Sequence, residues 1–313
     1  MWPRTEEPPF GPAASADEGE ADFPAAAAHL LKEQRVAIVG LGLIGGSLAL
    51  ALRGRCARLL AVERDPDARA LAQARSVVDE VSEAPERILP QADVVVLATP
   101  VQAIVELLAR LPEWHPGPAV VLDVGSTKTA IVAAMAALPP RFDPVGGHPM
   151  AGKETSGLVQ AEAGLFRGAP FALTPLPRTT GRAKALAAAL VESVGARALW
   201  LDPLTHDRWV AAVSHLPYLV SLALTLATPA EAAVLLGPGF RSTSRLAASS
   251  PRMMGDILST NREAVLAALA GFEQRLAALR AALQAGDEPA LEALLAQGPA
   301  RRAALLRVAE EGE

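Results

Sequence analysis

The stretch "VGLGLIGGSLALALRG", from Val39 to Gly54, constrains the fold of this chain more than any other segment. It begins as an apolar strand, turns through glycines with the spacing G-x-G-x-x-G, and continues as a helix. In such a turn the first glycine permits the bend, the second lets a pyrophosphate approach the backbone, and the third lets the helix pack close to the strand. The amides of the helix N-terminus then face the anion. We therefore predict a dinucleotide site, with a purely structural glycine turn as the alternative, at Gly40, Gly42, Leu43, Ile44 and Gly45.

The segments that follow predict an α/β fold. From Arg35 onward, short apolar runs alternate with amphipathic stretches, as in "RVAIVG", "LLAVE", "DVVVLATP" and "AVVLDVGS". Strands that are apolar at every position are typical of sheets covered on both faces. We predict a Rossmann-type, doubly wound and mostly parallel sheet over residues 34–201, which "PFALTP" and "ARALWLD" complete.

Strand patterns end after Asp202. Residues 202–313 predict an all-α C-terminal domain, in which "HDRWVAAVSHLPYLVSLALTLA" and "NREAVLAALAGFEQRLAALRAALQ" form long helices. One face of the second helix is apolar at every third or fourth position, through Leu266, Leu269, Phe272, Leu276, Leu279 and Leu283. So many apolar helices would leave surface exposed on one subunit, so we expect a homodimer through this domain, with a compact monomeric bundle as the alternative.

Composition excludes several other classes of protein. The 313 residues have a formal net charge of -5 and are 51% hydrophobic, which leaves little positive field for nucleic acid. A single cysteine, Cys56, cannot form an internal disulfide and lies in no pattern of metal ligands, so we expect a cytoplasmic protein without a metal. No apolar run reaches the roughly 20 residues of a membrane span, so we expect no membrane partner. Residues 1–33 lack periodicity and predict a disordered N-terminal extension.

Two later segments extend the expected cofactor site. Glu63 ends the second strand about 20 residues beyond the glycines, where a carboxylate accepts hydrogen bonds from a ribose and repels a 2′-phosphate. This favours NAD over NADP, although Arg64 offers a partner for such a phosphate and leaves NADP open. Thr99 and Pro100 follow a long apolar strand and are expected at the sheet edge where cofactors lie, unless they only form the loop.

Several segments together are more specific than the glycine turn. In chain order they are "GLGLIGGS", "DVGSTK", "GGHPMAGKETSG", "SHLP" and "GPGFRSTSRLAASSP". This set resembles the prephenate and arogenate dehydrogenase family, from about Arg35 to the C-terminus. The resemblance implies NAD-dependent oxidative decarboxylation of a cyclohexadienyl acid, in which hydride goes to NAD and carbon dioxide leaves as the ring becomes aromatic.

The resemblance also implies roles for two residues at the sheet edge. His148 matches the catalytic histidine of the family, and a neutral imidazole suits the removal of a hydroxyl proton near neutral pH. Ser126 matches a serine that hydrogen-bonds near the histidine, the substrate hydroxyl and the nicotinamide, although it could also be a helix N-cap. We expect Lys128, nearby, to be a surface lysine.

Substrate-binding residues are implied in the same way. Arg245 matches the arginine that binds the substrate carboxylate, and a guanidinium offers it two parallel hydrogen bonds; Arg241 lies four residues before it. His215 and Ser214 match a helix beneath the pocket, with a satisfied buried histidine as the alternative for His215. The remaining two positions are a carboxylate expected at the pocket mouth and a tyrosine where many relatives have histidine, namely Glu154 and Tyr218.

Other functions fit less well. Arogenate or dual specificity is the near alternative, which the sequence does not separate from prephenate specificity. A β-hydroxyacid dehydrogenase would need a lysine in the second domain, and no lysine follows Asp202. A dinucleotide-binding protein without turnover would have no use for His148, Ser126 and Arg245 together. We expect one activity only, without a fused mutase or amino-acid-sensing domain. His29, His115 and His206 match no motif and are not predicted to act.

Overall fold

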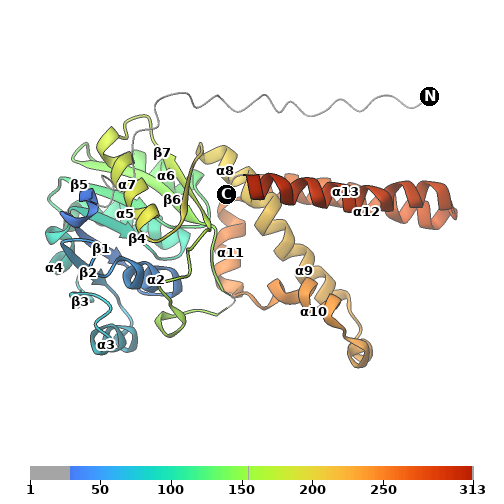
Figure 1. The fold of residues 1–313 in the computed structure, drawn as a ribbon, viewed down its shortest axis with the longest axis horizontal. Helices are drawn as coiled ribbons and strands as arrows, with labels where there is room; N and C mark the ends of the chain where they lie inside the picture. The colour runs from blue at the N-terminus through green and yellow to red at the C-terminus, as the bar shows by residue number, and fades with distance from the viewer. Residues whose placement is uncertain (1–28, 154, 312–313) are drawn as a thin grey trace.

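One eight-stranded sheet organises the first part of the chain in the computed structural model, which describes residues 29–153 and 155–311 (Figure 1). The strand order is β3-β2-β1-β4-β5-β6-β7-β8. Strands β3 to β6 in this order are parallel, β7 is antiparallel to β6, and β8 is parallel to β7. The bounds are β1 Arg35–Val39, β2 Arg58–Val62, β3 Glu80–Ser82, β4 Val94–Leu97, β5 Ala119–Asp123, β6 Phe142–Pro149, β7 Pro170–Pro175 and β8 Arg197–Trp200. The predicted mostly parallel sheet is confirmed, and both late strands belong to it.

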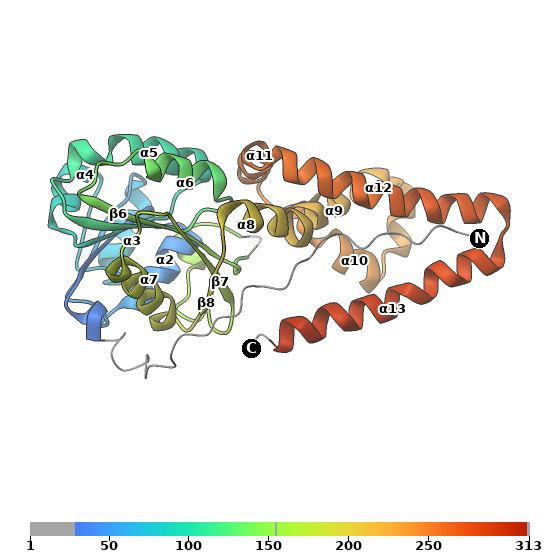
Figure 2. The same cartoon turned by 90° about the horizontal axis from the view of Figure 1, so that it is seen from above.

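Helices cover both faces of this sheet (Figure 2), which explains why its strands are apolar at every position. One face carries α2 (Leu43–Leu52), α3 (Pro66–Ala74) and α7 (Gly181–Ser193). The other carries α4 (Pro85–Ile88), α5 (Val101–Trp114) and α6 (Thr129–Ala136). Two short 3-10 turns, at Leu89–Gln91 and Leu158–Gln160, complete this part.

The folded part begins before the predicted boundary. Residues 29–32 form a helical turn, and Leu31 is completely buried in the core beneath α2. The predicted extension over residues 1–33 is therefore wrong at its C-terminal end, because one apolar side chain there packs against the sheet. The rest of that extension lies outside the described residues.

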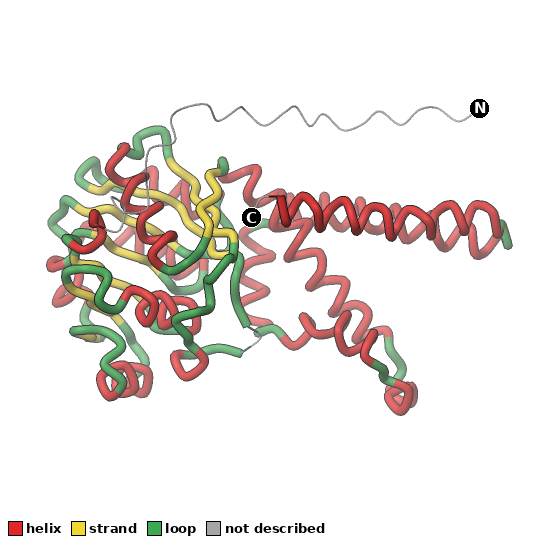
Figure 3. Tube along the Cα trace, in the orientation of Figure 1, coloured by secondary structure: helices red, strands yellow, loops and turns green. Residues whose placement is uncertain are grey.

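All elements described after β8 are helical (Figure 3), as predicted. A nearly continuous helix consists of α8 (Pro203–Val210), a π-helical segment (Ala211–His215) and α9 (Leu216–Ala227). After it come a 3-10 helix (Ala230–Leu235), α10 (Pro238–Ser244), a second 3-10 helix (Arg245–Ala248), α11 (Pro251–Thr260), α12 (Arg262–Ala285) and α13 (Glu288–Glu311). A buried cluster of Tyr218, Met254 and Ile257 joins α9 to α11.

The helical part docks on the sheet domain through α8 and α11. Helix α11 packs on α5, where the Gln102 amide donates to the Asp256 carboxylate at 3.2 Å. The Thr127 and Thr260 hydroxyls are 2.9 Å apart, and α8 packs on α6. These contacts bring the helical elements to the sheet edge at which β5 and β6 end.

Helices α12 and α13 extend away from the rest of the protein and diverge from their shared turn (Figure 2). Much of the predicted leucine stripe is consequently exposed on a single chain, with Leu266 57%, Leu276 55% and Leu283 64% exposed. Leu295 and Val308 on α13 are exposed as well. A compact monomeric bundle would have buried these side chains.

One helical run within the described residues is long and apolar enough to cross a membrane. The run spans Pro203–Ala227, and an 18-residue window within it has a mean hydropathy of 1.7. The sequence was predicted to contain no uninterrupted apolar run of about 20 residues. The mean hydropathy of this window is high nonetheless, because its polar residues, such as Ser214 and His215, are few and none is Asp, Glu, Lys or Arg. One run of this kind is weak evidence for a membrane, since core helices of other proteins have the same composition.

Candidate active site

The glycine turn lies where β1 and β4 are neighbours in the sheet. The chain leaves β1 toward β2 and later returns on the other side as β4, which makes this the point of strand-order reversal at which α/β sheets bind ligands. Gly40 has a φ of +95°, and a Cβ there would lie 2.8 Å from the Ala98 oxygen. A Cβ on Gly45 would collide with the Gly40 carbonyl oxygen. Both glycines are therefore required by the protein's own backbone.

Gly42 differs from the other two glycines. A Cβ built on it would have no protein atom within 4 Å, and it precedes the first residue of α2, whose amides have no side-chain cap. The open space beside it and the uncapped helix N-terminus, where Leu43 and Ile44 begin α2, fit a phosphate of a dinucleotide.

The other predicted cofactor residues surround the same turn. The Glu63 carboxylate accepts hydrogen bonds from the Leu41 amide at 2.5 Å and the Asp65 amide at 2.9 Å. Arg64 is exposed beside it. Thr99 contacts the turn, since its Cγ2 would lie 2.9 Å from a Cβ on Gly40, and its hydroxyl oxygen is buried without a protein partner. Pro100 is the exposed N-cap of α5.

His148 lies near the end of β6 and is partly exposed. Its Nδ1 is 2.9 Å from Nε2 of His206, and the two rings meet edge to face. His206 is buried on α8, and its Nδ1 is 2.8 Å from the Asp207 carboxylate. A carboxylate and two imidazoles thus form a hydrogen-bonded chain from the helical part to the sheet edge.

Asp207 also holds the start of α6. Its two carboxylate oxygens accept from the Lys128 amide at 2.7 Å and the Thr129 amide at 2.8 Å, two N-terminal amides that α6 itself leaves without a side-chain cap. Burial disfavours the charge of Asp207, but the hydrogen bonds from His206 and Thr129 outweigh it and lower the pKa of this carboxyl. Asp207 is therefore ionised and accepts from three donors.

His215 joins the same cluster from the π-helical segment. It is 1% exposed, its Nδ1 is 3.3 Å from Nδ2 of Asn261, and this amide also donates to the Asp207 carbonyl at 2.7 Å. Burial lowers the pKa of His215 to about 4. The structure thus favours the satisfied buried histidine, which the sequence had left open. A π-helical turn alters which side chains share a helix face, and such turns often occur at functional sites.

Lys128 is not the surface lysine that the sequence predicted. Its side chain is fully buried, pairs with the Asp123 carboxylate and donates to the Gly147 carbonyl at 2.6 Å. Asp123 in turn accepts from the Gly147 amide at 3.0 Å. Both backbone groups of Gly147 are therefore held by the ion pair, which orients the strand immediately before His148.

Ser126 follows β5 and is partly exposed. It is not the N-cap of α6, because the helix begins at Thr129 with Lys128 at the cap position, and Asp207 supplies the capping carboxylate from another element. The helix-capping role considered for Ser126 is thus performed by Asp207, which is remote in sequence.

The electrostatic surroundings keep His148 neutral. Burial of its ring by the surrounding protein, followed by the charges of His206, Lys128 and His215, lowers the pKa of His148 well below its usual value. A neutral imidazole with one nitrogen hydrogen-bonded to His206 can accept a proton at the other.

The predicted substrate-binding residues lie in the helical part. Arg245 begins the 3-10 helix that follows α10 and is exposed, as is Arg241 on α10. Ser214 is partly exposed in the π-helical segment, whereas Tyr218 packs in the cluster with Met254 and Ile257. Glu154 lies outside the described residues.

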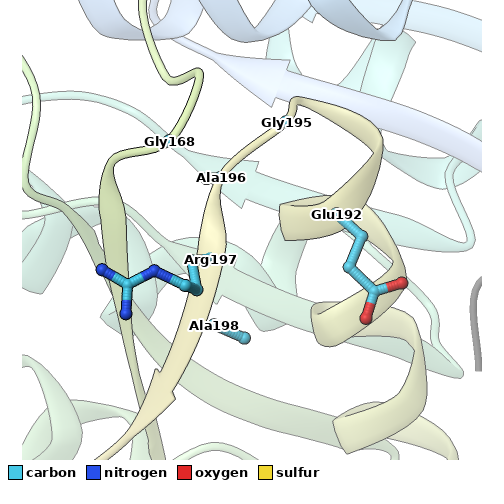
Figure 4. Close-up of a pocket in the computed structure, with 6 residues that line it drawn as sticks. All are labelled: Gly168, Glu192, Gly195, Ala196, Arg197 and Ala198. Carbon is cyan, nitrogen blue, oxygen red and sulfur yellow. The ribbon is translucent and has the colours of Figure 1, made fainter. Parts of the chain in front are cut away.

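A surface hollow of about 640 Å³ lies elsewhere, between the end of α7 and the start of β8 (Figure 4). It is lined by Gly168, Glu192, Gly195, Ala196, Arg197 and Ala198. None of the predicted site residues lines it. Within the described ranges, no group of three His, Cys, Asp or Glu side chains is arranged to hold a metal ion.

Sequence reasoning missed four residues that surround His148. They are Asp123, His206, Asp207 and Asn261. Asp123 lies at the end of an apolar strand, and Asp207 lies in a polar turn of a helix. Such patterns indicate whether a segment is buried or exposed, but not which residues its side chains contact. His206 was set aside because no motif includes it.

Comparisons with known proteins cover both parts of the chain. A family model described as the nucleotide-binding domain of prephenate dehydrogenase matches residues 48–200, and one described as its dimerization domain matches residues 202–297. The prephenate dehydrogenase of Bacillus subtilis is 34% identical over 74% of this chain and 65% of its own length, so the chain spans just under two thirds of that protein.

Two further relatives are matched over nearly their whole length. The cyclohexadienyl dehydrogenase of Zymomonas mobilis is 31% identical over 81% of this chain and 90% of its own. The crystal structure of prephenate dehydrogenase from A. aeolicus in complex with hydroxyphenyl propionate and NAD+ has a TM-score of 0.80 at 31% identity, and covers 88% of this chain and 99% of that one.

Proposed function

The chain belongs to the prephenate dehydrogenase family, and from this premise we propose that it converts prephenate to 4-hydroxyphenylpyruvate, with His148 as the base. The single observation that supports this assignment best is the placement of His148 at the same sheet edge as the glycine turn, with one imidazole nitrogen engaged by His206.

NAD is the cofactor of this family fold, and the chain's own residues fit it. When bound, NAD accepts a hydride from the substrate. Gly42 leaves room for the pyrophosphate beside the amides of α2, and Glu63 is held against the turn where its carboxylate accepts from ribose hydroxyls. The buried hydroxyl of Thr99, which has no protein partner, is a further polar group that a bound cofactor can satisfy.

His148 removes the proton from the substrate 4-hydroxyl as the hydride departs from the same carbon. The ring carboxylate then leaves as carbon dioxide, and its bonding electrons complete the aromatic ring. Because Nδ1 of His148 faces His206, Nε2 is the nitrogen that takes the proton. Ser126, at the end of β5, orients the same hydroxyl.

Arg245 binds a substrate carboxylate in this proposal. A guanidinium offers two parallel hydrogen bonds to such a group. Tyr218, Ser214 and His215 lie on the adjoining helix, but His215 and Tyr218 are buried among protein side chains, so they act on the substrate only by shaping the pocket from behind. Glu154 keeps its proposed place at the pocket mouth on the resemblance alone.

The experiment that tests this function is a set of four steady-state assays, prephenate and arogenate each with NAD and NADP. We expect the highest kcat/KM with prephenate and NAD. Higher kcat/KM with arogenate would replace the substrate assignment by the cyclohexadienyl alternative, which relatives such as the Zymomonas mobilis enzyme represent. Absence of turnover with all four combinations would leave only a dinucleotide-binding protein.

We also propose a homodimer through the helical part. The dimerization-domain model covers residues 202–297, and the exposed leucines of α12 and α13 have no partner surface within the described chain. A second copy buries them most simply, because an isologous interface brings the same apolar face from both subunits together. Sedimentation should give twice the monomer mass of 32.5 kDa. A cytoplasmic location remains a prediction of the sequence.

A further inference from the structure

We infer that His206 and Asp207 are positioning residues that hold the His148 imidazole with its proton on Nδ1, so that Nε2 faces the substrate as the proton acceptor. The inference rests on the proposed role of His148 and extends it to two residues on α8, which no motif in the sequence had indicated.

The direction of each hydrogen bond follows from Asp207. An ionised carboxylate only accepts, so Nδ1 of His206, at 2.8 Å, must carry a proton and donate it. In the neutral His206 ring, Nε2 is then a lone pair, and Nδ1 of His148, at 2.9 Å, must donate to it. The remaining nitrogen of His148 is left unprotonated.

The surroundings make this arrangement rigid. Asp207 is fixed by the α6 amides of Lys128 and Thr129, and His206 is 1% exposed. The ion pair of Lys128 and Asp123 fixes the backbone of Gly147 on the other side. Neither ring can therefore turn without breaking a buried hydrogen bond.

The hydrogen-bonded series from His148 through His206 to Asp207 also stabilises the protonated, positively charged form of His148. When His148 takes the substrate proton, its imidazolium donates to His206, whose far side meets the negative charge of Asp207. The other titratable or charged groups that face His148 are Lys128, paired with Asp123, and His215, which burial keeps neutral. Asp207 is thus the anion that favours proton transfer.

Asp207→Asn is the sharpest test, because it removes the negative charge that fixes both tautomers. The carboxylate accepts from two α6 amides and from His206, and a neutral amide side chain has only one oxygen for these three donors, so the proton on Nδ1 of His206 is no longer held in place. We expect kcat to fall by about 10²- to 10⁴-fold, the range for loss of a positioned base, while the KM for prephenate and the affinity for NAD change by less than about threefold. Unchanged kcat would overturn the inference.

A second pair of variants keeps the test valid if Asp207→Asn does not fold, since Asp207 also caps α6. His206→Gln retains an oxygen that accepts from Nδ1 of His148, whereas His206→Leu retains none. We expect the glutamine variant to lose about tenfold less kcat than the leucine variant. Equal kcat values in both variants would overturn the inference.

The tautomer can be observed directly. The chain has 5 histidines, so nitrogen-15 shifts of histidine-labelled protein can be assigned by comparison with His148 and His206 variants. We expect protonated Nδ1 at His148 in the wild type and a mixture of the two tautomers in Asp207→Asn. Protonated Nε2 in the wild type would overturn the inference. His148→Asn distinguishes the proposed base from the proposed positioning residues. Retained turnover in His148→Asn would refute His148 as the base. Loss of turnover in His148→Asn, together with fully active His206 variants, would refute only the positioning role of His206.

Discussion

Lys128 and Asp123 form an ion pair with both side chains fully shielded from solvent. Burial lowers the pKa of the lysine and raises that of the carboxyl, and each group's charge opposes the shift of the other. The pair holds the amide and carbonyl of Gly147, one residue before His148. A charged pair in this position links the stability of the sheet edge to the orientation of His148.

Removing one member of this pair should be costly. Lys128→Met leaves the Asp123 carboxylate buried without its partner, which typically costs about 3–5 kcal/mol. Urea unfolding should show a loss of this size. Lys184→Met, at an exposed position on α7, is the matched control and should change the free energy of unfolding by less than about 0.5 kcal/mol. Equal effects of the two substitutions would refute the buried pair.

The proposed role of His148 as the base can be tested by a substitution that leaves the net charge unchanged, because the histidine is neutral. His148→Asn should lower kcat by about 10²- to 10⁴-fold, because no group at the sheet edge then takes the hydroxyl proton. NAD affinity, measured by calorimetry, should remain within about threefold of the wild type, since the cofactor residues surround the glycine turn. A variant that kept most of its kcat would show that another group is the base.

Gly42 separates cofactor binding from folding. Gly42→Val places a side chain in space that no protein atom occupies, so the melting temperature should change little, whereas the approach of the pyrophosphate is blocked and NAD affinity should fall by at least about tenfold. Gly181→Val, at an equally open position on α7, should leave both quantities unchanged. Unaltered NAD affinity in Gly42→Val would contradict the dinucleotide site.

Arg245→Gln should act mainly on substrate binding. Loss of a charge pair with a carboxylate costs about 2–5 kcal/mol, so we expect the KM for prephenate to rise at least about thirtyfold, the lower end of that range, with a smaller change in kcat. Arg55→Gln, an exposed arginine of the sheet domain, is the control and should leave the KM unchanged. A KM unaffected by Arg245→Gln would remove this arginine from the substrate site.

Stability should depend on pH through His215. Its pKa is about 4 in the folded protein because of burial, against about 6.5 for an exposed histidine. The unfolded chain therefore binds the proton first, so this contribution is complete above pH 6.5 and is lost as the pH falls toward 4, up to about 3 kcal/mol. The difference in unfolding free energy between pH 7 and pH 4.5 should be smaller in His215→Gln than in the wild type. If the pKa of His215 were the same in the folded and unfolded protein, the wild type and His215→Gln would show equal differences, which would contradict this prediction.

The strand, glycine turn and helix of the proposed cofactor site were largely predictable. Gly40 and Gly45 are required by close backbone contacts within one strand-turn-helix unit, and the carboxylate of Glu63 follows the next strand. Such a unit can be predicted from local sequence, because the spacing of its glycines is set by a single turn between a strand and a helix. The position of His148 at the end of a strand was likewise evident from its motif.

The surroundings of His148 were not predictable in the same way. His206 contacts it from 58 positions further along the chain and from a different domain, and Lys128 is buried only because Asp123, Gly147 and Asp207 enclose it. The spacing of apolar residues indicates which face of a helix or strand is buried. It does not indicate which polar side chains from other elements lie against that face.

The sequence by itself determined a parallel sheet with a glycine turn, a helical second half and a histidine at the sheet edge, because these follow from local backbone and apolar spacing. Only the tertiary structure decided that β7 runs antiparallel and that Asp207 and His206 reach His148. The direction of β7 depends on how strands pair within the sheet, and the contact of His206 with His148 depends on how two domains dock. Both are settled by the combined fit of surfaces that lie far apart in the chain.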